Sequence, residues 1–334
     1  MIRFAVIGIN HGHIYGQVNL LLAAGAQLVS FFAPEPELAA PFAKAFPQAA
    51  LARSAEEILA DASIHLLVTA GIPCERSSLC IEAMRRGKDV MSDKPAFTNL
   101  EQLAEARRVQ VETRRIYSIC YSERFENGAT VRAGELVAAG EIGRVIQTIG
   151  LGPHRLNLPT RPPWFFERAK YGGILCDIGS HQADQFLFFT GSTEAEAVSA
   201  QVRNVNYPQY PELQDFGDVM WRGNGGTGYA RVDWFTPDGL PVWGDGRLTI
   251  LGTEGYIECR KYIDIAGRPG SAHLFVANQR GVRYEDCSHV ALPYGRLLVN
   301  DILNRTETAM PQAHAFLAAE LALKAQLMAE GAGE

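Results

Sequence analysis

A carboxylate and an imidazole stand four positions apart in the stretch GGILCDIGSHQAD, at Asp177 and His181. If this stretch is helical, the spacing places both side chains on one face, one turn apart. Such a pair can move a proton, because histidine titrates near neutral pH. We interpret His181 as a candidate acid/base residue. The alternative, a helix cap and a packed histidine, stays open, and two ligands are too few to predict a metal site.

A lysine follows another short apolar run, in DVMSDKPAF. The run predicts a strand, so Asp93, Lys94 and Pro95 would lie at its carboxyl end. Open α/β sheets bind their ligands at this edge. Lys94 could there orient a ligand or polarise a carbonyl group, although a lysine before proline is also common in solvated turns.

The stretch VIGINHGHIYG resembles a dinucleotide-binding turn with altered glycines. The G-x-G-x-x-G fingerprint is occupied by Gly8, Asn10 and His13. Gly8 permits the tight turn, and we expect Asn10 to preserve it because asparagine tolerates the left-handed backbone conformation. Gly12 would give the close approach that a phosphate needs, at a helix start whose N–H groups are unpaired. The interpretation of this turn as purely structural stays open at this point.

The end of the second predicted strand bears on the type of cofactor. In FFAPEPE, Ala33 stands where an acidic residue normally binds the adenosine ribose, and Glu35 follows two positions later. No Lys or Arg follows that could pair with a 2′-phosphate. A bound dinucleotide is therefore predicted to be NAD(H) rather than NADP(H).

The elements that must position these residues change character along the chain. Up to residue 122, short β-branched runs alternate with helical patterns, which predicts a doubly wound parallel sheet, a Rossmann domain. Strands are expected at 3–9, 26–33, 64–71, 88–93 and 115–122, with helices at 14–25, 35–47, 74–87 and 99–113.

The remaining residues, 123–334, predict a second domain of the α+β class. Helices are expected at 129–143 and 177–191, and strand patterns separated by turn residues fill 194–287, as in a large open, mostly antiparallel sheet. A last helix, about 307–330, is expected to pack back on the first domain. One face of the sheet should be bare and apolar, so we expect a homodimer or a higher homo-oligomer formed through it.

The composition excludes several classes of partner. The 334 residues contain 31 Lys and Arg against 37 Asp and Glu, and no basic run exceeds two residues, so nucleic acid is not an expected partner. No apolar stretch approaches the roughly 20 residues of a membrane span. The six cysteines are scattered, without a C-x-x-C pair, which is typical of reduced thiols. We expect a cytoplasmic protein that binds a small molecule.

Taken together, the glycine turn, D-K-P and G-G-x-x-x-D-x-x-x-H resemble the Gfo/Idh/MocA family of NAD(P)-dependent oxidoreductases. The family pattern E-K-P corresponds to Asp93-Lys94-Pro95, with a conservative departure at the acidic residue. The family pattern G-G-G-x-x-x-D-x-G-x-H matches at Gly172, Gly173, Asp177, Gly179 and His181, and LTILGTEGYIE resembles a family strand-turn-strand. The resemblance implies that Lys94 positions the substrate hydroxyl and the nicotinamide. It also implies that His181 exchanges the hydroxyl proton and that Asp177 aids substrate placement and the proton relay between Lys94 and His181.

The expected site residues fall into three groups. The catalytic group is Lys94, Asp177 and His181. Cofactor contacts are expected from Gly8, Asn10, His11, Gly12, His13, Ala33, Glu35, Ala70, Gly71, Pro73, Asp93, Lys94 and Pro95. Substrate contacts are expected from Tyr121, Arg124, His154, Arg155, Trp164 and His181, and Arg161 lies in the same connection.

Three functions remain open from the sequence. The first is hydride transfer between the nicotinamide and a secondary alcohol or ketone of a sugar, polyol or related small hydroxy compound. The second is a non-catalytic sensor of the same fold that binds a dinucleotide or a sugar, which the altered glycines motivate. The third is an NAD-dependent lyase or glycosidase in which the hydride is returned within each turnover.

Overall fold

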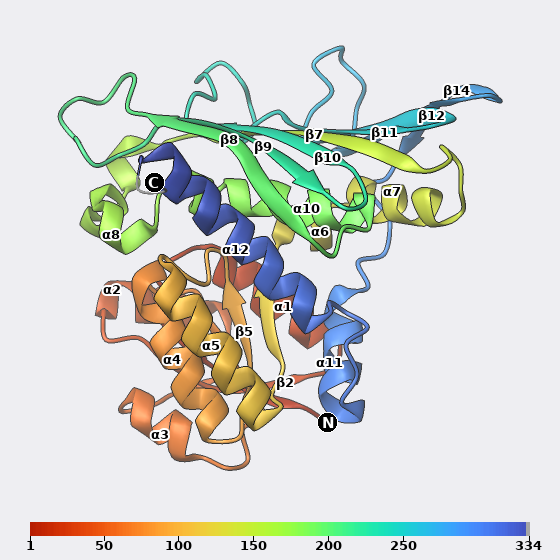
Figure 1. Ribbon diagram of the computed structural model, residues 1–334. Helices are drawn as coiled ribbons and strands as arrows, with labels where there is room; N and C mark the ends of the chain where they lie inside the picture. The colour runs from red at the N-terminus through yellow and green to blue at the C-terminus, as the bar shows by residue number, and fades with distance from the viewer. Residues whose placement is uncertain (332–334) are drawn as a thin grey trace. The chain divides into compact units, whose positions relative to one another are not determined.

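The structure, a computed structural model, describes residues 1–331 (Figure 1). The chain divides into two compact units. Unit 1 comprises Met1–Cys120, Ala169–Gly172 and Pro293–Phe316, and unit 2 comprises Tyr121–Arg168, Gly173–Leu292 and Leu317–Glu334. The sequence-based boundary at residue 122 had assigned 169–172 and 293–316 to the second domain.

Unit 1 contains a six-stranded sheet in the order β3-β2-β1-β4-β5-β6. Every neighbouring pair is parallel, as the alternation of strands and helices predicted. The strand order reverses between β1 and β4, and ligands of such sheets bind at this reversal. The strands are β1 Arg3–Ile7, β2 Gln27–Phe32, β3 Ala50–Leu51, β4 Leu66–Thr69, β5 Asp89–Asp93 and β6 Tyr117–Cys120.

The helices of unit 1 include two that the sequence analysis did not predict, α3 and α11. Helix α11 packs against α1, and α4 packs against α5. The bounds are α1 His13–Ala23, α2 Pro36–Ala45, α3 Ala55–Ala60, α4 Pro73–Arg85, α5 Leu100–Thr113 and α11 Tyr294–Asn304. The short helix α8, Arg168–Tyr171, and the long helix α12, Gln312–Ala329, each include residues of both units.

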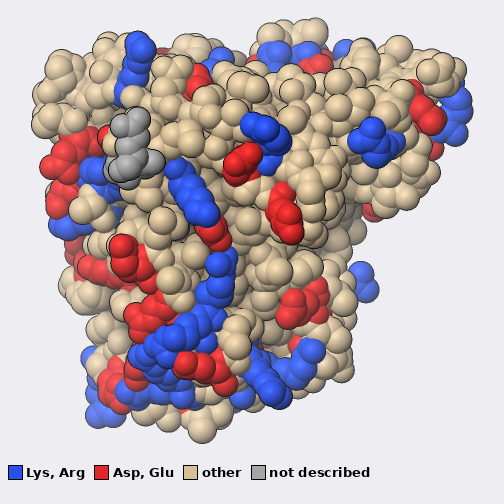
Figure 2. Space-filling view, in the orientation of Figure 1, with Lys and Arg blue, Asp and Glu red and all other residues tan. Residues whose placement is uncertain are grey.

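The solvent side of α4 and α5 carries charges of both signs. Figure 2 shows blue and red side chains interleaved over these two helices. Arg85 of α4 pairs with Glu105 of α5 at 3.1 Å, and Arg108 pairs with Glu112 one turn later at 2.5 Å. Exposed pairs of this kind contribute little stability each, so they mark a solvated helix face.

Unit 2 contains an eight-stranded sheet in the order β14-β13-β12-β11-β7-β10-β9-β8. The pair β7 and β10 is parallel and the other six pairs are antiparallel, which confirms the predicted mostly antiparallel sheet. The strands are β7 Val145–Pro153, β8 Ala195–Arg203, β9 Phe216–Gly223, β10 Thr227–Asp233, β11 Gly246–Gly252, β12 Gly255–Lys261, β13 Ala272–Asn278 and β14 Gly281–Asp286.

Helices cover one side of this sheet. Figure 1 shows α6 Ser122–Phe125, α7 Gly128–Ala138 and α10 Gly179–Thr190 on the same side, with α10 against β7 and β10. Helix α7 packs against β12 and β13, where Ala133, Leu136, Ile257 and Leu274 are buried in one cluster. The core of unit 2 therefore lies between these helices and one face of the sheet.

The opposite face of the sheet exposes apolar side chains. Cross-strand partners form a row in which Met220 lies beside Tyr229, Tyr229 beside Ile149, and Ile149 beside Thr249. A second row places Leu251 beside Tyr256. Met220 is 45% exposed and Ile149 is 37% exposed, although both are apolar. This face fits the expected oligomer surface.

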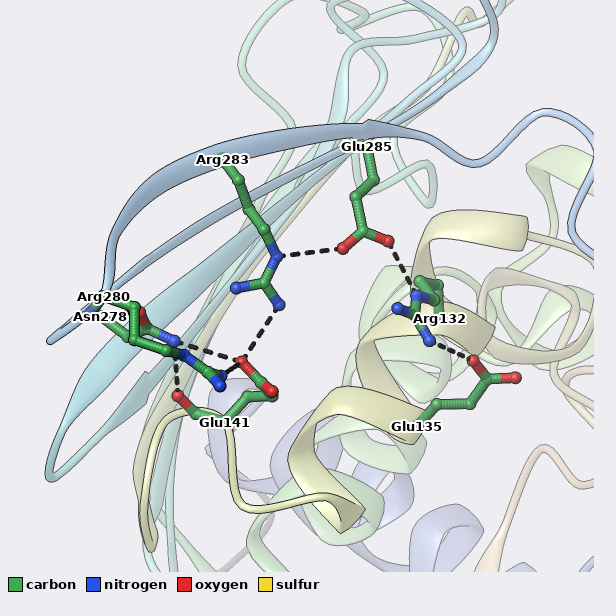
Figure 3. Close-up of polar contacts among 7 residues, drawn as sticks. All are labelled: Arg132, Glu135, Glu141, Asn278, Arg280, Arg283 and Glu285. Carbon is green, nitrogen blue, oxygen red and sulfur yellow. Dashed lines mark hydrogen bonds and ion pairs between the residues drawn. The ribbon is translucent and has the colours of Figure 1, made fainter.

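Ion pairs fasten the β13–β14 hairpin to α7 and to the turn that follows α7. Figure 3 shows Arg132 of α7 between Glu135 and Glu285, at 2.8 Å from each carboxylate. Glu141 accepts hydrogen bonds from Arg280 and Arg283 of the hairpin. The hairpin at the edge of the sheet is thus held by side chains as well as by strand pairing.

Most of the cysteine side chains are buried. All six cysteines are free thiols, and five of them are buried. Burial raises the pKa of the Cys80 thiol to about 12. None of the described helices is long and apolar enough to cross a membrane.

Candidate functional site

The turn after β1 requires glycine at position 8. Gly8 has φ +79°, and a Cβ atom there would lie 2.9 Å from Cα of Gly71. The amide of Ala70 donates to the carbonyl of Gly8 at 3.1 Å, and the amide of His11 donates to the carbonyl of Ala70 at 2.9 Å. The turns after β1 and β4 therefore meet where the strand order reverses.

Helix α1 begins at a glycine, and the first N–H groups that we expected to be unpaired have partners. The amide of His13 donates to Nδ1 of His11 at 3.3 Å, and the amides of Ile14 and Tyr15 donate to the carbonyls of His11 and Gly12, both at 3.3 Å. The N-cap residue is Gly12, and the first turn carries no acidic residue. A Cβ atom at Gly12 would meet nothing within 4 Å. A helix start with no acidic residue and open space beside its N-cap glycine fits a dinucleotide pyrophosphate, because the positive end of the helix dipole favours an anion.

Asn10 does not take the left-handed conformation that we expected of it. Among the described residues, the non-glycine positions with positive φ are Arg114, Asn157, Tyr262 and Arg305. Because Gly8 already supplies the positive φ of the turn, position 10 does not need one. The Asn10 side chain instead donates from Nδ2 to Oε1 of Glu35 at 3.0 Å.

Glu35 is placed to accept a further hydrogen bond. It is the N-cap residue of α2, and its Oε2 atom is buried without a hydrogen-bond partner among the described residues. A buried carboxylate oxygen without a donor is costly, so a ligand hydroxyl would satisfy it. Ala33, at the end of β2, is buried and offers no polar side-chain atom.

Asp93, at the end of β5, is fully buried and lies at the centre of a polar cluster. Its Oδ1 lies 3.0 Å from Nδ1 of His13 and accepts from Nε2 of Gln17 at 3.0 Å. Its Oδ2 lies 3.4 Å from Arg76 and 3.6 Å from His11. Burial by itself raises the pKa of Asp93, but His13 and Arg76 outweigh it and hold the pKa well below its usual range.

The surroundings of His11 favour its neutral form. The amide of His13 donates to Nδ1 of His11 at 3.3 Å, so the neutral ring carries its proton on Nε2. Burial, followed by the nearby His13, lowers the pKa of His11 well below its usual value. An Nε2–H group beside the start of α1 is suited to donate to a phosphate oxygen.

The ligand atoms of His11, His13 and Asp93 lie within 4.8 Å of one another, which is compatible with a metal ion. The Asp93 carboxylate, however, already accepts from Gln17 and faces the Arg76 guanidinium. A fixed positive charge 3.4 Å from a ligand oxygen opposes a cation. We therefore assign these residues to hydrogen bonding.

Arg76 is an important residue of this cluster that sequence reasoning missed. Its Nε donates to the carbonyl of Gly71 at 2.7 Å, and its Nη1 donates to the carbonyls of Lys94 and Pro95 at 2.8 and 3.0 Å. Arg76 thereby joins the turn after β4 to the segment after β5. The available indication was its place on α4, on the face that buries Cys80.

The remaining cofactor candidates of unit 1 lie at the same edge of the sheet. Lys94 follows β5 directly, and its side chain is buried. Pro73 begins α4, directly after the turn at Gly71 and Ile72. Unit 1 thus gathers the predicted cofactor residues at the carboxyl ends of its strands, and their contacts with a cofactor stay a prediction.

In unit 2, the second glycine of the G-G motif is required by a close approach. Gly173 has φ +88°, and a Cβ atom there would lie 2.3 Å from the Gln326 side chain. Oε1 of Gln326 accepts from the amide of Leu175 at 3.0 Å, and Oε1 of Gln214 accepts from the amide of Ile174 at 3.0 Å. These two glutamines hold the first turn of α9, Ile174–Asp177.

The single helix predicted from residue 177 is wrong, because the structure has two. Asp177 ends α9, and α10 begins at Gly179. The amide of His181 donates to the carbonyl of Ile178 at 3.1 Å, a tight i→i−3 bond at a glycine-containing junction. His181 is buried in the first turn of α10, with its ring centroid 6.3 Å from that of Tyr121.

Two of the predicted substrate residues, Arg124 and Arg155, form hydrogen bonds within the protein that hold elements of unit 2 together. Arg124 is buried and forms a bidentate pair with Asp184, with both hydrogen bonds at 2.7 Å. Arg155 donates to Asp238 at 3.0 Å and to backbone carbonyls at 237, 240 and 242. Arg124 joins α6 to α10, and Arg155 holds the loop after β10.

Two further substrate candidates, His154 and Trp164, lie at an aromatic cluster. The ring of His154 lies 5.5 Å from Trp234 and 6.0 Å from Trp243. Trp164 lies 6.2 Å from Phe165, which contacts Trp234 in turn. Phe165 and Trp234 are buried within this cluster, whereas Trp243 is 37% exposed.

Comparisons with known proteins agree with this architecture. A family model described as "Oxidoreductase family, NAD-binding Rossmann fold" matches residues 2–121, and one described as "GFO/IDH/MocA C-terminal domain" matches 130–258. A crystal structure from Erwinia carotovora atroseptica SCRI1043, described as an oxidoreductase, is 48% identical, covers 98% of this chain and 99% of its own, and has a TM-score of 0.96. The chain belongs to the GFO/IDH/MocA family of oxidoreductases.

Relatives within the GFO/IDH/MocA family include enzymes of both cofactor types. The NAD(+)-named scyllo-inositol 2-dehydrogenase of Bacillus subtilis (strain 168) is 27% identical over 260 residues, 77% of this chain and 73% of its own. The NADP(+)-named scyllo-inositol 2-dehydrogenase of the same strain is 28% identical over 182 residues, 52% of this chain and 49% of its own. These matches confirm the prediction that the chain is an oxidoreductase of this family. The relatives differ in their named cofactor, so the matches determine neither the substrate nor the cofactor preference of this chain.

Proposed function

We propose that the protein is a dehydrogenase that moves a hydride between the nicotinamide and a secondary alcohol or ketone of a polyol, a sugar or a related small hydroxy compound. The observation that carries the proposal is the start of α1 after the tight turn at Gly8, where the N-cap residue is Gly12, the first turn has no acidic residue and a Cβ atom at Gly12 would meet nothing within 4 Å. A dinucleotide pyrophosphate fits there. The Bacillus relatives, named for oxidation of scyllo-inositol, support a polyhydroxy substrate.

The cofactor is NAD(H) in this proposal. Oε2 of Glu35 has no hydrogen-bond partner among the described residues, and a ribose hydroxyl would donate to it. A 2′-phosphate in the same place would meet a negative charge instead. Because the carboxylate is fixed by Asn10, it cannot turn away without losing a hydrogen bond.

In this proposal, proton transfer and charge stabilisation are carried out by residues of the D-K-P and G-G-x-x-x-D-x-x-x-H motifs. When bound, the nicotinamide accepts or returns the hydride. His181 takes the hydroxyl proton in the direction of oxidation and returns it in the direction of reduction. Asp177 stabilises the charged imidazole, and Lys94 donates to the reacting oxygen, which favours the alkoxide as the hydride leaves.

The test is turnover with NAD and a panel of polyols, sugars and sugar acids, measured as formation of reduced nicotinamide. His181→Gln and Lys94→Met should each lower kcat by about 10²-fold or more, because each removes a proton-transfer or charge-stabilising group. Tyr229→Phe, on the exposed sheet face, is the matched control and should keep full activity.

Melting curves and NADH titrations must show that the variants fold and bind cofactor. Near-full activity of either catalytic variant would contradict the mechanism. Product formed without net reduced nicotinamide would identify the lyase or glycosidase alternative, and cofactor binding without any product would identify a sensor.

A further inference from the structure

Arg161 lies in an aromatic cage that no other arginine of the connection after β7 shares. Its Cζ atom lies 4.3 Å from the ring centroid of Phe165, 4.8 Å from Trp234 and 5.5 Å from Trp243. Phe165 and Trp234 also contact each other, with centroids 5.3 Å apart. Ring faces hold the guanidinium in place and shield it from water.

Most of the hydrogen-bonding capacity of Arg161 is unused. Nε donates to the carbonyl of Leu156 at 2.6 Å, and Nη2 donates to the carbonyl of Arg155 at 3.2 Å. These bonds account for two of the five guanidinium N–H groups. Over the described residues 1–331, no hydrogen bond leaves Nη1, and no carboxylate lies within 4.0 Å of Arg161.

Among the described residues, Arg161 lacks a carboxylate partner although its guanidinium is partly buried. Burial lowers the pKa of the Arg161 guanidinium, and the charge of Asp177 opposes that effect without reaching ion-pair distance. In contrast, Arg124 and Arg155 of the same unit both have carboxylate partners. A partly desolvated cation without a counter-ion is costly, and the cost disappears when an anion binds.

Asp177 connects this cation with the proposed reaction. It is the charged residue that acts on Arg161 electrostatically, and it ends the short helix that precedes His181. Arg161, Asp177 and His181 all belong to unit 2, so this relationship lies within one compact body. A group held by Nη1 of Arg161 would therefore lie near the acid/base residues.

We propose that Arg161 is a specificity-determining residue that binds the carboxylate of an acidic polyhydroxy substrate, such as an aldonate or a uronate. Nη1 and the free N–H of Nη2 form the edge of the guanidinium that pairs with two carboxylate oxygens. The ring of Trp243, a residue that is 37% exposed, packs against the carbon skeleton. This inference rests on the proposed dehydrogenase function and names the substrate class within it.

The test compares matched substrates that differ in the carboxylate, D-gluconate against D-glucitol and D-glucuronate against D-glucose, with NAD. The wild type should have the higher kcat/KM on the acid of at least one pair. Arg161→Met should raise KM for that acid by about 100-fold, the loss expected of a bidentate charged pair, with a much smaller change on the neutral partner. Arg161→Lys should recover part of the loss.

Controls separate specificity from folding and from the dehydrogenase proposal. Arg222→Met removes an exposed arginine of the same unit, whose pair with Glu196 spans 3.6 Å, and should change neither KM nor the melting temperature. If Arg161→Met does not fold, the wild-type preference and Arg161→Lys decide the question.

The outcomes are distinguishable. Equal or better wild-type turnover of both neutral partners would overturn the role of Arg161 and leave the dehydrogenase proposal standing. If no compound is turned over, calorimetry of D-gluconate and D-glucuronate with the NADH-loaded protein decides, since the absence of binding overturns the inference. Failure to bind NADH in a folded sample would instead overturn the dehydrogenase proposal.

Discussion

Nδ2 of Asn10 lies 3.0 Å from Oε1 of Glu35, so the residue in place of the second fingerprint glycine holds a carboxylate at the start of α2. A side chain of the altered turn is therefore hydrogen-bonded to the start of α2. This link connects the two departures from the family pattern, the missing glycine and the displaced acidic residue. We expect them to act together on cofactor choice.

Glu35 should set the preference for NADH over NADPH. Glu35→Gln removes the negative charge but keeps the shape of the side chain. It should weaken the binding of NADH by about 10-fold and strengthen the binding of NADPH, because the repulsion of the 2′-phosphate disappears. Calorimetric titration with both cofactors measures the change. Glu37→Gln, two residues later in α2, is the matched control. A wild type that binds NADPH more tightly, or a Glu35→Gln variant with unchanged preference, would contradict this role.

Gly8 and Gly12 should respond differently to the same substitution. Gly8→Ala places a methyl group against Gly71 in a left-handed conformation and should lower the free energy of unfolding by about 1–3 kcal/mol or more. Gly12→Ala meets nothing in the protein, so stability should be nearly unchanged while NADH binding weakens, because the methyl group enters the space of the pyrophosphate. Denaturant unfolding and NADH titration separate the two effects. Equal stability loss at both positions would be inconsistent with the geometry.

Part of this arrangement was predictable and part was not. The apolar runs that became β1, β4 and β5 are bounded by turn residues, so their order and parallel pairing followed from local pattern. The contact of His13 with Asp93 joins residues 80 positions apart, and no spacing rule reports it. The sequence analysis did not single out Arg76, because its burial depends on the elements that pack around α4.

The site of unit 2 shows the same limit. The G-G-x-x-x-D-x-x-x-H motif identified Asp177 and His181, but the break at Ile178 depends on the hydrogen bonds of α9 with Gln214 and Gln326, which are distant in sequence. Helix α11 was missed because its strongly amphipathic pattern follows directly on the strand-rich segment.

Asp93 should make the stability of the protein sensitive to acid. Its pKa is depressed in the folded state, so its stabilising contribution is complete above the unfolded value of about 3.9 and is lost as the pH falls below it. Asp93→Asn should cost about 3–5 kcal/mol at neutral pH, because Arg76 loses its buried carboxylate partner.

Chemical denaturation of the wild type and the Asp93→Asn variant checks this behaviour. The difference in unfolding free energy between them should have its maximum value at about pH 6, and it should decrease as the pH falls through about 4 toward 2. Glu194→Gln, at an exposed position, should show no such difference. A constant gap across this range would mean that Asp93 is not held ionised in the folded protein.

The exposed apolar row on the sheet of unit 2 should mediate self-association. Met220→Glu and Ile149→Glu place charges in a row where these two residues flank Tyr229, and each should convert a dimer or larger assembly into smaller species. Sedimentation velocity at micromolar concentration measures the assembly. Val111→Glu, at a 68% exposed apolar position of α5, is the control and should leave it intact. A monomeric wild type would contradict the use of this face.

The most direct test of hydride transfer follows an isotope. The folded protein is incubated with NAD and polyhydroxy compounds that carry deuterium on their secondary alcohol carbons, and the nicotinamide is analysed by mass spectrometry. The dehydrogenase proposal predicts reduced nicotinamide that contains one deuterium and accumulates with the oxidised product. Unlabelled cofactor with every compound, in a sample that binds NADH, would contradict it.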